Sequence, residues 1–362
     1  MIKHGSAFVL AVLLALAGQA QTPLTILAQF NPSNTGGTCG IAYNAPAGET
    51  MVIGCSANTI DRYAEDGTFI ASSPLFGESA NDVDIDISPA SLFLNGTFVD
   101  QGQLLLINGE TDVAEIYALD QGTNTGIDTL TTAFGVSHVV GGSYHPQRGT
   151  FFLVQDMVPS GFQENRVAEV DAVTGDTLQT FPLAPHFVVN YGDLDISPVS
   201  GNLFLVSSDE DSSDEDSIAE FSPDGVYIAG HALPPGVSAL SGIALDNDLE
   251  GAWVCNTSGV VFKLGNFPVG IADGPLPGLR TPPFPNPTAG PLHLPFQGHT
   301  AEPGRIVLLD ASGRPVALLF EGRFPKEGTL RLDLSGLAPG PYVVLVREGT
   351  ANTRAFPLVL VR

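Results

Sequence analysis

The sequence predicts an all-β protein, a five-bladed β-propeller followed by a small immunoglobulin-like β-sandwich. Three observations lead to this prediction. Residues 21–272 read as short alternating strands and turn signals with almost no helical periodicity, which is typical of sheet proteins. The same stretch repeats itself about every 50 residues, as propeller blades do. Residues 305–360 contain a second set of alternating strands of sandwich-like size.

Residues 1–20 have the features of a secretory signal peptide. Lys3 and His4 precede an apolar run from Phe8 to Ala17, and small residues follow it where a signal peptidase would cleave. The run is too short to span a bilayer as a helix. No later run reaches that length either, so we expect no transmembrane segment. The alternative is a buried N-terminal strand.

Five copies of a hairpin pattern follow one another through residues 21–272. The copies begin at Gly40, Val83, Gly141, Gly192 and Gly242. The turn of the hairpin carries Pro46, Pro89, Pro146, Pro198 and, in the fifth copy, Asp248. Most copies continue into a second hairpin, which gives the four strands that a blade needs. A sixth blade would require one divergent copy.

The segment LTILAQF (residues 24–30) is similar to the outermost strand of a blade. The fifth copy lacks an obvious fourth strand, so we expect this segment to complete it and to close the ring. The segments GIALDNDLEGAWV and IAEFSPDGVYIAG resemble NHL-type and related propeller repeats. This resemblance implies a fold and no function, because propellers include hydrolases, lyases, adhesins and scaffolds.

Charge divides the chain into two parts. Residues 21–272 contain 32 acidic and 4 basic residues, whereas residues 284–362 contain 6 acidic and 8 basic residues. Residues 273–283 are rich in proline and glycine, as expected of a linker between two domains. The acidic part would repel nucleic acids and anionic membranes. It suits a solvated surface or an attraction for cations.

Three cysteines lie in the mature chain, at Cys39, Cys55 and Cys255. Export permits disulfides. Cys39 and Cys55 flank the first hairpin at positions that antiparallel pairing places opposite each other, so we predict that they are bonded. Two other pairings are compatible with the sequence. None of the three cysteines has the spacing of a zinc site.

Acidic pairs recur at one place in two copies, Asp84 with Asp86 and Asp193 with Asp195. Of these, Asp84 and Asp193 could converge with Asp82 and Asn190 at the mouth of a central channel and bind a cation such as calcium. The alternative is a set of turn caps that bind their own backbone.

The acidic run from Asp209 to Ser217 offers a second candidate for calcium. Its Asp209, Asp211 and Asp214 could supply oxygen ligands, although the run lacks the spacing of a helical calcium-binding loop. The alternative is a solvated loop.

Two histidines, His138 and His145, flank the first strand of the third copy, where a histidine beside a carboxylate could act as a general base. The alternative is a solvated side chain. No complete catalytic motif is present, so the sequence leaves open whether the protein is an enzyme. The catalytic candidates are Asp84, Asp193, Asn190 and His138.

The segments FPNPTAG, VLLDASGRPV and LDLSGLAPGPYVVLV follow one another from Phe284 to Val346. In order and spacing they resemble the C-terminal sorting domain of type IX secretion. The motif positions are Pro285, Asn286, Pro287, Asp310, Gly313, Leu337, Gly340 and Tyr342. The resemblance implies Sec export, then passage through the outer-membrane translocon, in a host of the Bacteroidota type. The alternative is an unrelated carbohydrate-binding sandwich.

The sequence therefore predicts a secreted or cell-surface propeller that binds an unknown ligand, a glycan or a protein. Two other classes stay open at this point. One is a cation-dependent hydrolase or lyase that acts on a sugar or lactone, and the other is a purely structural surface component.

Overall fold

The computed structural model describes most of the chain between Pro23 and Val361. The predicted signal peptide and most of the predicted linker lie outside the described residues. The stretches left out are 1–22, 33–36, 55–58, 76–82, 110–112, 136–137, 157–164, 198–199, 209–216, 247–250, 268–282, 298–302, 311–314, 349–351 and 362. The described residues form strands, turns and loops with no helix, and accordingly none of their segments is a helix able to cross a lipid bilayer.

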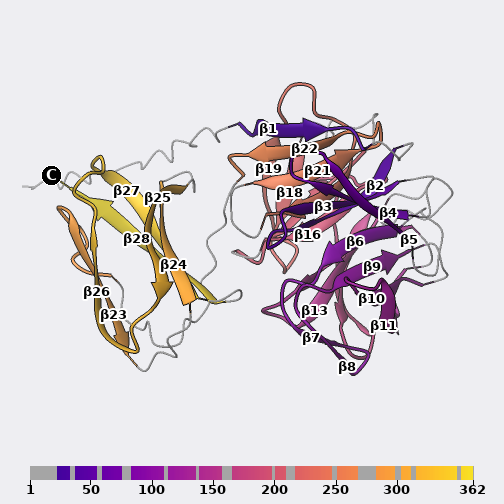
Figure 1. Cartoon of the computed structure of the whole chain (residues 1–362), viewed down its shortest axis with the longest axis horizontal. Coiled ribbons are helices and arrows are strands. Elements are labelled where there is room, and N and C mark those ends of the chain that lie inside the picture. Colours follow the sequence, from indigo (N-terminus) through magenta and orange to yellow (C-terminus); the bar gives the residue numbers. More distant parts are fainter. Residues whose placement is uncertain are drawn as a thin grey trace, which may run out of the picture.

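Residues 25–265 form five antiparallel sheets of four strands each, which we call the five-sheet region (Figure 1). Apolar side chains alternate along the strands or fill them completely, as expected for strands buried on one or both faces. The sheets are β2 (Thr38–Asn44), β3 (Glu49–Gly54), β4 (Thr59–Ala64) and β5 (Phe69–Pro74); β6 (Val83–Ile87), β9 (Leu104–Asn108), β10 (Glu115–Asp120) and β11 (Thr125–Thr131); β12 (Val139–His145), β13 (Thr150–Gln155), β14 (Arg166–Asp171) and β15 (Thr177–Pro182); β16 (Asp193–Ile196), β17 (Leu203–Val206), β18 (Ser217–Phe221) and β19 (Tyr227–Ala232); and β20 (Leu240–Leu245), β21 (Ala252–Asn256), β22 (Val261–Gly265) and β1 (Thr25–Phe30).

The first strands of the five sheets lie next to one another. Strand β2 contacts β6 and β20, β6 also contacts β12, and β16 contacts both β12 and β20. These five strands, β2, β6, β12, β16 and β20, are called the inner strands below. They belong to separate sheets, so backbone pairing within a sheet does not join them to one another.

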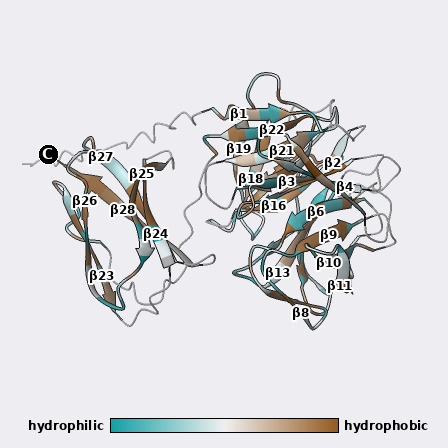
Figure 2. Cartoon of the chain, viewed as in Figure 1, coloured by the Kyte–Doolittle hydropathy of each residue, from teal (hydrophilic) through white to brown (hydrophobic). Residues whose placement is uncertain are grey.

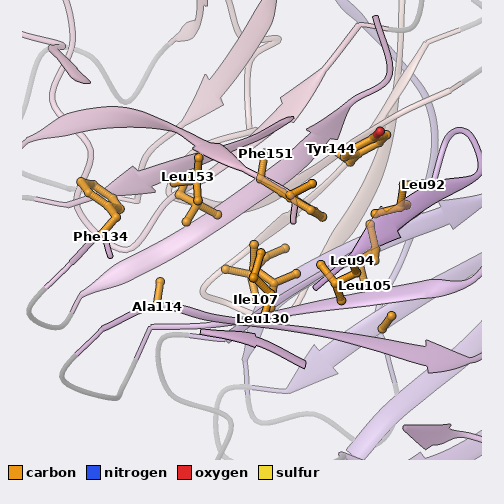
Figure 3. Close-up of a cluster of buried hydrophobic side chains, with 14 of the residues drawn as sticks. Leu92, Leu94, Leu105, Ile107, Ala114, Leu130, Phe134, Tyr144, Phe151 and Leu153 are labelled. Carbon is orange, nitrogen blue, oxygen red and sulfur yellow. The ribbon is translucent and has the colours of Figure 1, made fainter. Parts of the chain in front are cut away.

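Apolar cores fill the spaces between neighbouring sheets. Between the second and third sheets, Leu105 and Ile107 of β9 face Phe151 and Leu153 of β13 (Figure 3). Similar buried clusters join the third sheet to the fourth, the fourth to the fifth, the first to the second and the fifth to the first. Figure 2 shows the apolar character of β9. Each sheet therefore buries both of its faces.

The second sheet differs from the sequence-based expectation. The second sequence repeat, which begins at Val83 and turns at Pro89, would place Leu92 and Phe93 in the strand that pairs with β6. Instead β7 (Leu92–Leu94) pairs with β8 (Thr97–Val99) in a separate hairpin. The strand that pairs with β6 is β9 instead. Asn95 and Gly96 form the turn of the inserted hairpin, both with positive φ, which favours this two-residue connection. The short apolar run Leu92–Leu94 is therefore part of an inserted hairpin and not of the four-stranded sheet.

Strand β1 completes the fifth sheet by pairing antiparallel with β22, as expected from the sequence. Its last residue, Phe30, packs against Tyr63 of the first sheet, with ring centroids 5.3 Å apart, and against Trp253 of the fifth, at 6.2 Å. The Lys263 ammonium lies over the ring of Tyr43 of the first sheet at 5.7 Å and is 3.6 Å from the carboxylate of Glu65, which follows β4. Aromatic packing and a buried cation thus hold the first and last sheets together.

The C-terminal region (residues 283–361) has two further antiparallel sheets. Among the described residues of this region, buried apolar side chains form one core between the two sheets, which includes Leu294, Leu308 and Phe356. The two-stranded sheet contains β23 (Pro291–Gln297) and β26 (Glu327–Asp333), and the four-stranded sheet contains β25 (Pro315–Arg323), β24 (Pro303–Asp310), β27 (Gly340–Glu348) and β28 (Asn352–Leu360).

We predict that Phe30→Ala lowers the free energy of unfolding by about 2 kcal/mol, because a half-buried ring that joins two sheets leaves a gap behind it. Leu178→Ala is the matched control, since Leu178 lies on an outer strand with 54% of its surface exposed. That control should change stability by less than about 0.5 kcal/mol. Denaturant unfolding of both variants checks this, and equal losses would show that β1 does not hold the first and last sheets together.

Candidate functional site: the inner-strand aspartates and the His138–Asp156 pair

The recurring aspartates lie on two of the inner strands and bind the next inner strand along. On β16, Asp193 accepts the N–H of Ile243 at 2.9 Å and Asp195 accepts the N–H of Leu245 at 2.6 Å, both from β20. On β6, Asp86 accepts the hydroxyl of Ser143 of β12 at 2.8 Å. We call Asp84, Asp86, Asp193 and Asp195 the inner-strand aspartates. They link strands that belong to different sheets.

Asp86, Asp193 and Asp195 also accept the backbone N–H of the residue that follows each of them in the sequence. These are local side-chain-to-backbone bonds, but they lie within β6 and β16 and not at turns, so the aspartates are not the turn caps that the sequence left open. The second oxygen is then directed at the neighbouring sheet. Burial makes such charge-assisted bonds costly to lose, because an unpaired backbone N–H inside the protein loses its hydration without compensation.

Asp84 and Asp193 are buried, and their carboxyl groups contact each other. Burial and the neighbouring acid raise the pKa of Asp84 well above its usual value, and burial also raises the pKa of Asp193. Both oxygens of Asp193 accept backbone N–H groups, whereas Oδ1 of Asp84 accepts no hydrogen bond from a described residue. Asp84 is therefore the better place for a shared proton, which it would donate to Asp193.

Glycines on the flanking inner strands make room for these carboxylates. A Cβ at Gly40 would lie 2.9 Å from Oδ1 of Asp84, and a Cβ at Gly141 would overlap Oδ1 of Asp193. A larger side chain at either place would push the carboxyl group out of position. The glycines that open two of the sequence repeats are thus explained by close approach to the inner-strand aspartates.

The described carboxyl groups of the predicted cation site are bonded to the protein and are not directed at a space for an ion. Asp84 and Asp193 come together, but their oxygens face backbone N–H groups and each other. Among the described residues no group of three or more His, Cys, Asp or Glu side chains is arranged to hold a metal ion. Asp82, Asp209, Asp211 and Asp214 lie outside the described residues, so calcium binding there stays a prediction.

His138 lies beside a different carboxylate, Asp156. Nδ1 of His138 is 3.6 Å from Oδ1 of Asp156, and the side chain of Asp156 is almost completely buried. The N–H of Asp156 donates to the carbonyl of His138 at 3.1 Å, and Oδ2 of Asp156 accepts the N–H of Tyr191 at 3.3 Å. At 3.6 Å the two side-chain atoms are beyond direct hydrogen-bond distance, so the buried carboxylate is a close electrostatic neighbour of the part-exposed imidazole. A general base would use this pair with the contact shortened in the substrate complex.

Sequence reasoning did not find Asp156 or Tyr191. Asp156 directly follows the apolar strand β13, and a carboxylate at the end of a buried strand was an available signal. Asn190, which was a candidate, bonds to Ser207 and Ser208 through its backbone, so its backbone holds the loop before β16. His145 is buried, and burial lowers its pKa to about 4. The imidazole of His145 is therefore neutral near pH 7.

Cys39 is disulfide-bonded, and Cys255 is a free, buried thiol whose pKa burial raises to about 12. Cys55, the partner predicted for Cys39, lies outside the described residues. The raised pKa leaves Cys255 protonated and unreactive near neutral pH.

The FPNPTAG segment joins the two sheets of the C-terminal region. Phe284 exchanges two backbone hydrogen bonds with His293 of β23. Further along, Thr288 bonds to Val359 and Val361 beside β28, and Oδ1 of Asn286 accepts the N–H of Val359 at 2.9 Å. The asparagine and threonine of the segment therefore have a clear structural role, since they fix its path across the edge of the core.

The other motif positions lie within the same fold where they are described. Asp310 of β24 pairs with Tyr342 of β27, and the Tyr342 hydroxyl donates to the carbonyl of Ala338 at 2.8 Å. Leu337 packs against the core, and Gly340 begins β27. Pro285 and Pro287 flank Asn286, whereas Gly313 lies outside the described residues.

Residues 283–356 match the family model described as the secretion system C-terminal sorting domain. No curated protein matches the chain. The match supports export by type IX secretion, contact with that secretion machinery, and delivery to the cell surface or beyond it. The comparisons assign no activity to the five-sheet region.

We predict opposite outcomes for two isosteric changes in the buried acid pair. Asp84→Asn should change the free energy of unfolding at pH 7 by less than about 1 kcal/mol, because an amide N–H₂ can replace the proton donor. Asp193→Asn should cost about 2 kcal/mol or more, because its N–H₂ would face a backbone N–H that now bonds to a carboxylate. Denaturant unfolding measures both values, and equal losses would contradict the placement of the proton on Asp84.

We predict that the protein loses stability as the pH rises above about 6.5. Burial and the neighbouring Asp193 raise the pKa of Asp84 well above its usual value, and burial raises the pKa of Asp193 to about 8, so near neutral pH the folded pair holds a shared proton that the unfolded state has released. The pKa of Asp195 is raised only to about 6, so its own loss of stability is largely complete by pH 6.5. Stability is then lost as the pH rises through the folded-state values, by up to about 1.4 kcal/mol per pH unit for each such proton. Ordinary carboxylates are already ionised above pH 6.5 and add little to this slope.

Below pH 6.5 His145 acts in the opposite sense, because its lowered pKa makes the folded state bind fewer protons there. Melting temperatures between pH 5 and 9 check the profile. The fall of melting temperature with pH above 6.5 should be smaller in Asp84→Asn. An unchanged fall in that variant would show that other groups cause the loss of stability.

Proposed function

We propose that the five-sheet region is a five-bladed β-propeller that acts outside the cell as a binding module. Five four-stranded sheets, inner strands in mutual contact, a shared core between each neighbouring pair and the pairing of β1 with β22 support the propeller. The blades resemble NHL-type repeats in the segments quoted above. In this proposal the Sec signal at residues 1–20 starts export, and the sorting domain at residues 284–362 completes it.

The hydrogen bonds and burial of the inner-strand aspartates are the observation that favours binding over catalysis. A hydrolase with a cation at the channel mouth would need these carboxylates free to hold the ion. Asp193 and Asp195 instead bond to backbone N–H groups of β20 and stay buried. Their chemistry is accounted for by holding the sheets together, so a surface rather than the channel is the better place for a ligand.

A hydrolase or lyase remains the second candidate because of one observation. The imidazole of His138 lies beside the buried carboxylate of Asp156, which is how a general base is oriented. In that case the pair would remove a proton from water or from a substrate hydroxyl.

The deciding experiment measures retention and turnover in parallel. We expect the mature chain to be retained by at least one immobilised glycan or extracellular matrix protein, and to leave chromogenic glycosides and lactones intact. Release of product that His138→Asn abolishes would favour the enzyme. Neither retention nor turnover would favour a purely structural surface component.

A further inference from the structure

His138 and Tyr191 precede two neighbouring inner strands and share one buried carboxylate. Oδ1 of Asp156 lies 3.6 Å from Nδ1 of His138, and Oδ2 accepts the N–H of Tyr191 at 3.3 Å. The backbone N–H of Asp156 also donates to the carbonyl of His138 at 3.1 Å, so Asp156 joins the two residues by one backbone bond and one side-chain bond. These three residues are called the His138 site.

Both His138 and Tyr191 have a positive φ, which is uncommon for residues other than glycine and is least favourable for a bulky side chain such as tyrosine. The φ angles are 57° at His138 and 48° at Tyr191, in the left-handed region where glycine would be unstrained. Ala239, before β20, has a φ of 53° and a buried side chain. The turn itself is therefore a feature of the fold, and it accepts a small residue. A bulky tyrosine at such a place points to a role for its side chain.

The side chains of the site are accessible to a ligand. The tyrosine is 51% exposed, and the imidazole of His138 is 26% exposed. An aromatic ring offers an apolar face to the C–H face of a sugar ring. An oriented imidazole can accept or donate a hydrogen bond to a sugar hydroxyl.

The net charge of the region indicates which class of carbohydrate the site would accept. Residues 21–272 contain 32 acidic residues against 4 basic ones, so the surrounding surface repels anions. Acidic polysaccharides and phosphorylated glycans would approach against this field, whereas a neutral glycan would not.

We propose that His138 and Tyr191 form a subsite for a neutral carbohydrate, with Asp156 as the positioning residue. This inference rests on the proposed binding function and specifies its ligand class and its place. It also explains why strain is kept at Tyr191, where glycine would relieve it.

The test uses the mature full-length chain and neutral probes, namely cellohexaose, xylohexaose, chitohexaose and mannan, with alginate as an anionic comparison. Affinity is measured by calorimetry, or by retardation in polysaccharide gels for mannan. We expect at least one neutral probe to bind more tightly than alginate. Tyr191→Gly should weaken that binding at least tenfold without lowering the melting temperature, because glycine suits the backbone there.

Ala239→Gly is the matched control, since it introduces the same residue into the same backbone conformation and should leave affinity unchanged. His138→Asn, which keeps a polar side chain that tolerates positive φ, should weaken binding while Asp156 stays partnered. Full affinity in Tyr191→Gly would overturn the proposal.

A second surface separates failure of this site from failure of the binding function. Phe93 and Phe98 form an exposed aromatic pair on the inserted hairpin, with ring centroids 5.5 Å apart. Carbohydrate binding could be lost in the double variant Phe93→Ser and Phe98→Ser but kept in Tyr191→Gly. That result would place the site at the inserted hairpin and would still support the proposed binding function. If no neutral probe binds, the carbohydrate inference fails, and retention on matrix proteins then decides the binding function alone.

Discussion

The structure of the five-sheet region depends on how its inner strands are joined. Apolar cores fill the spaces between the sheets, but the inner strands meet without backbone pairing, and their N–H groups need acceptors. Asp193 and Asp195 supply those acceptors to β20, and Asp84 accepts the N–H of Gly142 on β12 at 3.4 Å. These three carboxylates take the place of ladder hydrogen bonds between sheets, whereas Asp86 accepts the side-chain hydroxyl of Ser143 on β12. Carboxyl groups crowded at the meeting point of the strands then have to share protons, which couples the assembly to pH.

The same requirement decides what the recurring aspartates can do chemically. A carboxylate whose two oxygens accept backbone N–H groups inside the protein is a poor ligand for an additional cation, because the ion would have to compete with bonds that hold the sheets. The residues that remain available are on the surface before the inner strands. His138 and Tyr191 lie there, both attached to Asp156. The inner-strand aspartates thus have a structural role, whereas Asp156 positions the two residues that face a ligand.

Much of this architecture could be predicted from the sequence, and the failures have physical reasons. The second hairpins, the completing strand β1 and the sorting segment were accessible because turn residues and strand alternation are local signals. The inserted hairpin was missed because LFL before NGT looks like any short strand, and its partner is decided by packing. The Asp156 contact with His138 and Tyr191 joins residues from three segments, and no local pattern encodes it. The roles of Asp84 and Asp193 also depended on partners in other sheets.

The inner-strand aspartates hold the sheets together only if Asp84 and Asp193, crowded at the meeting point of the strands, share a buried proton. Infrared difference spectra of the mature chain at neutral pH test it directly, because a protonated carboxyl group in an apolar interior has its own C=O stretch. We expect such a band in the wild-type protein and a weaker one in Asp84→Asn, since burial and Asp195 also raise the pKa of Asp86 well above its usual value. A wild-type spectrum with only ionised carboxylates would contradict this expectation.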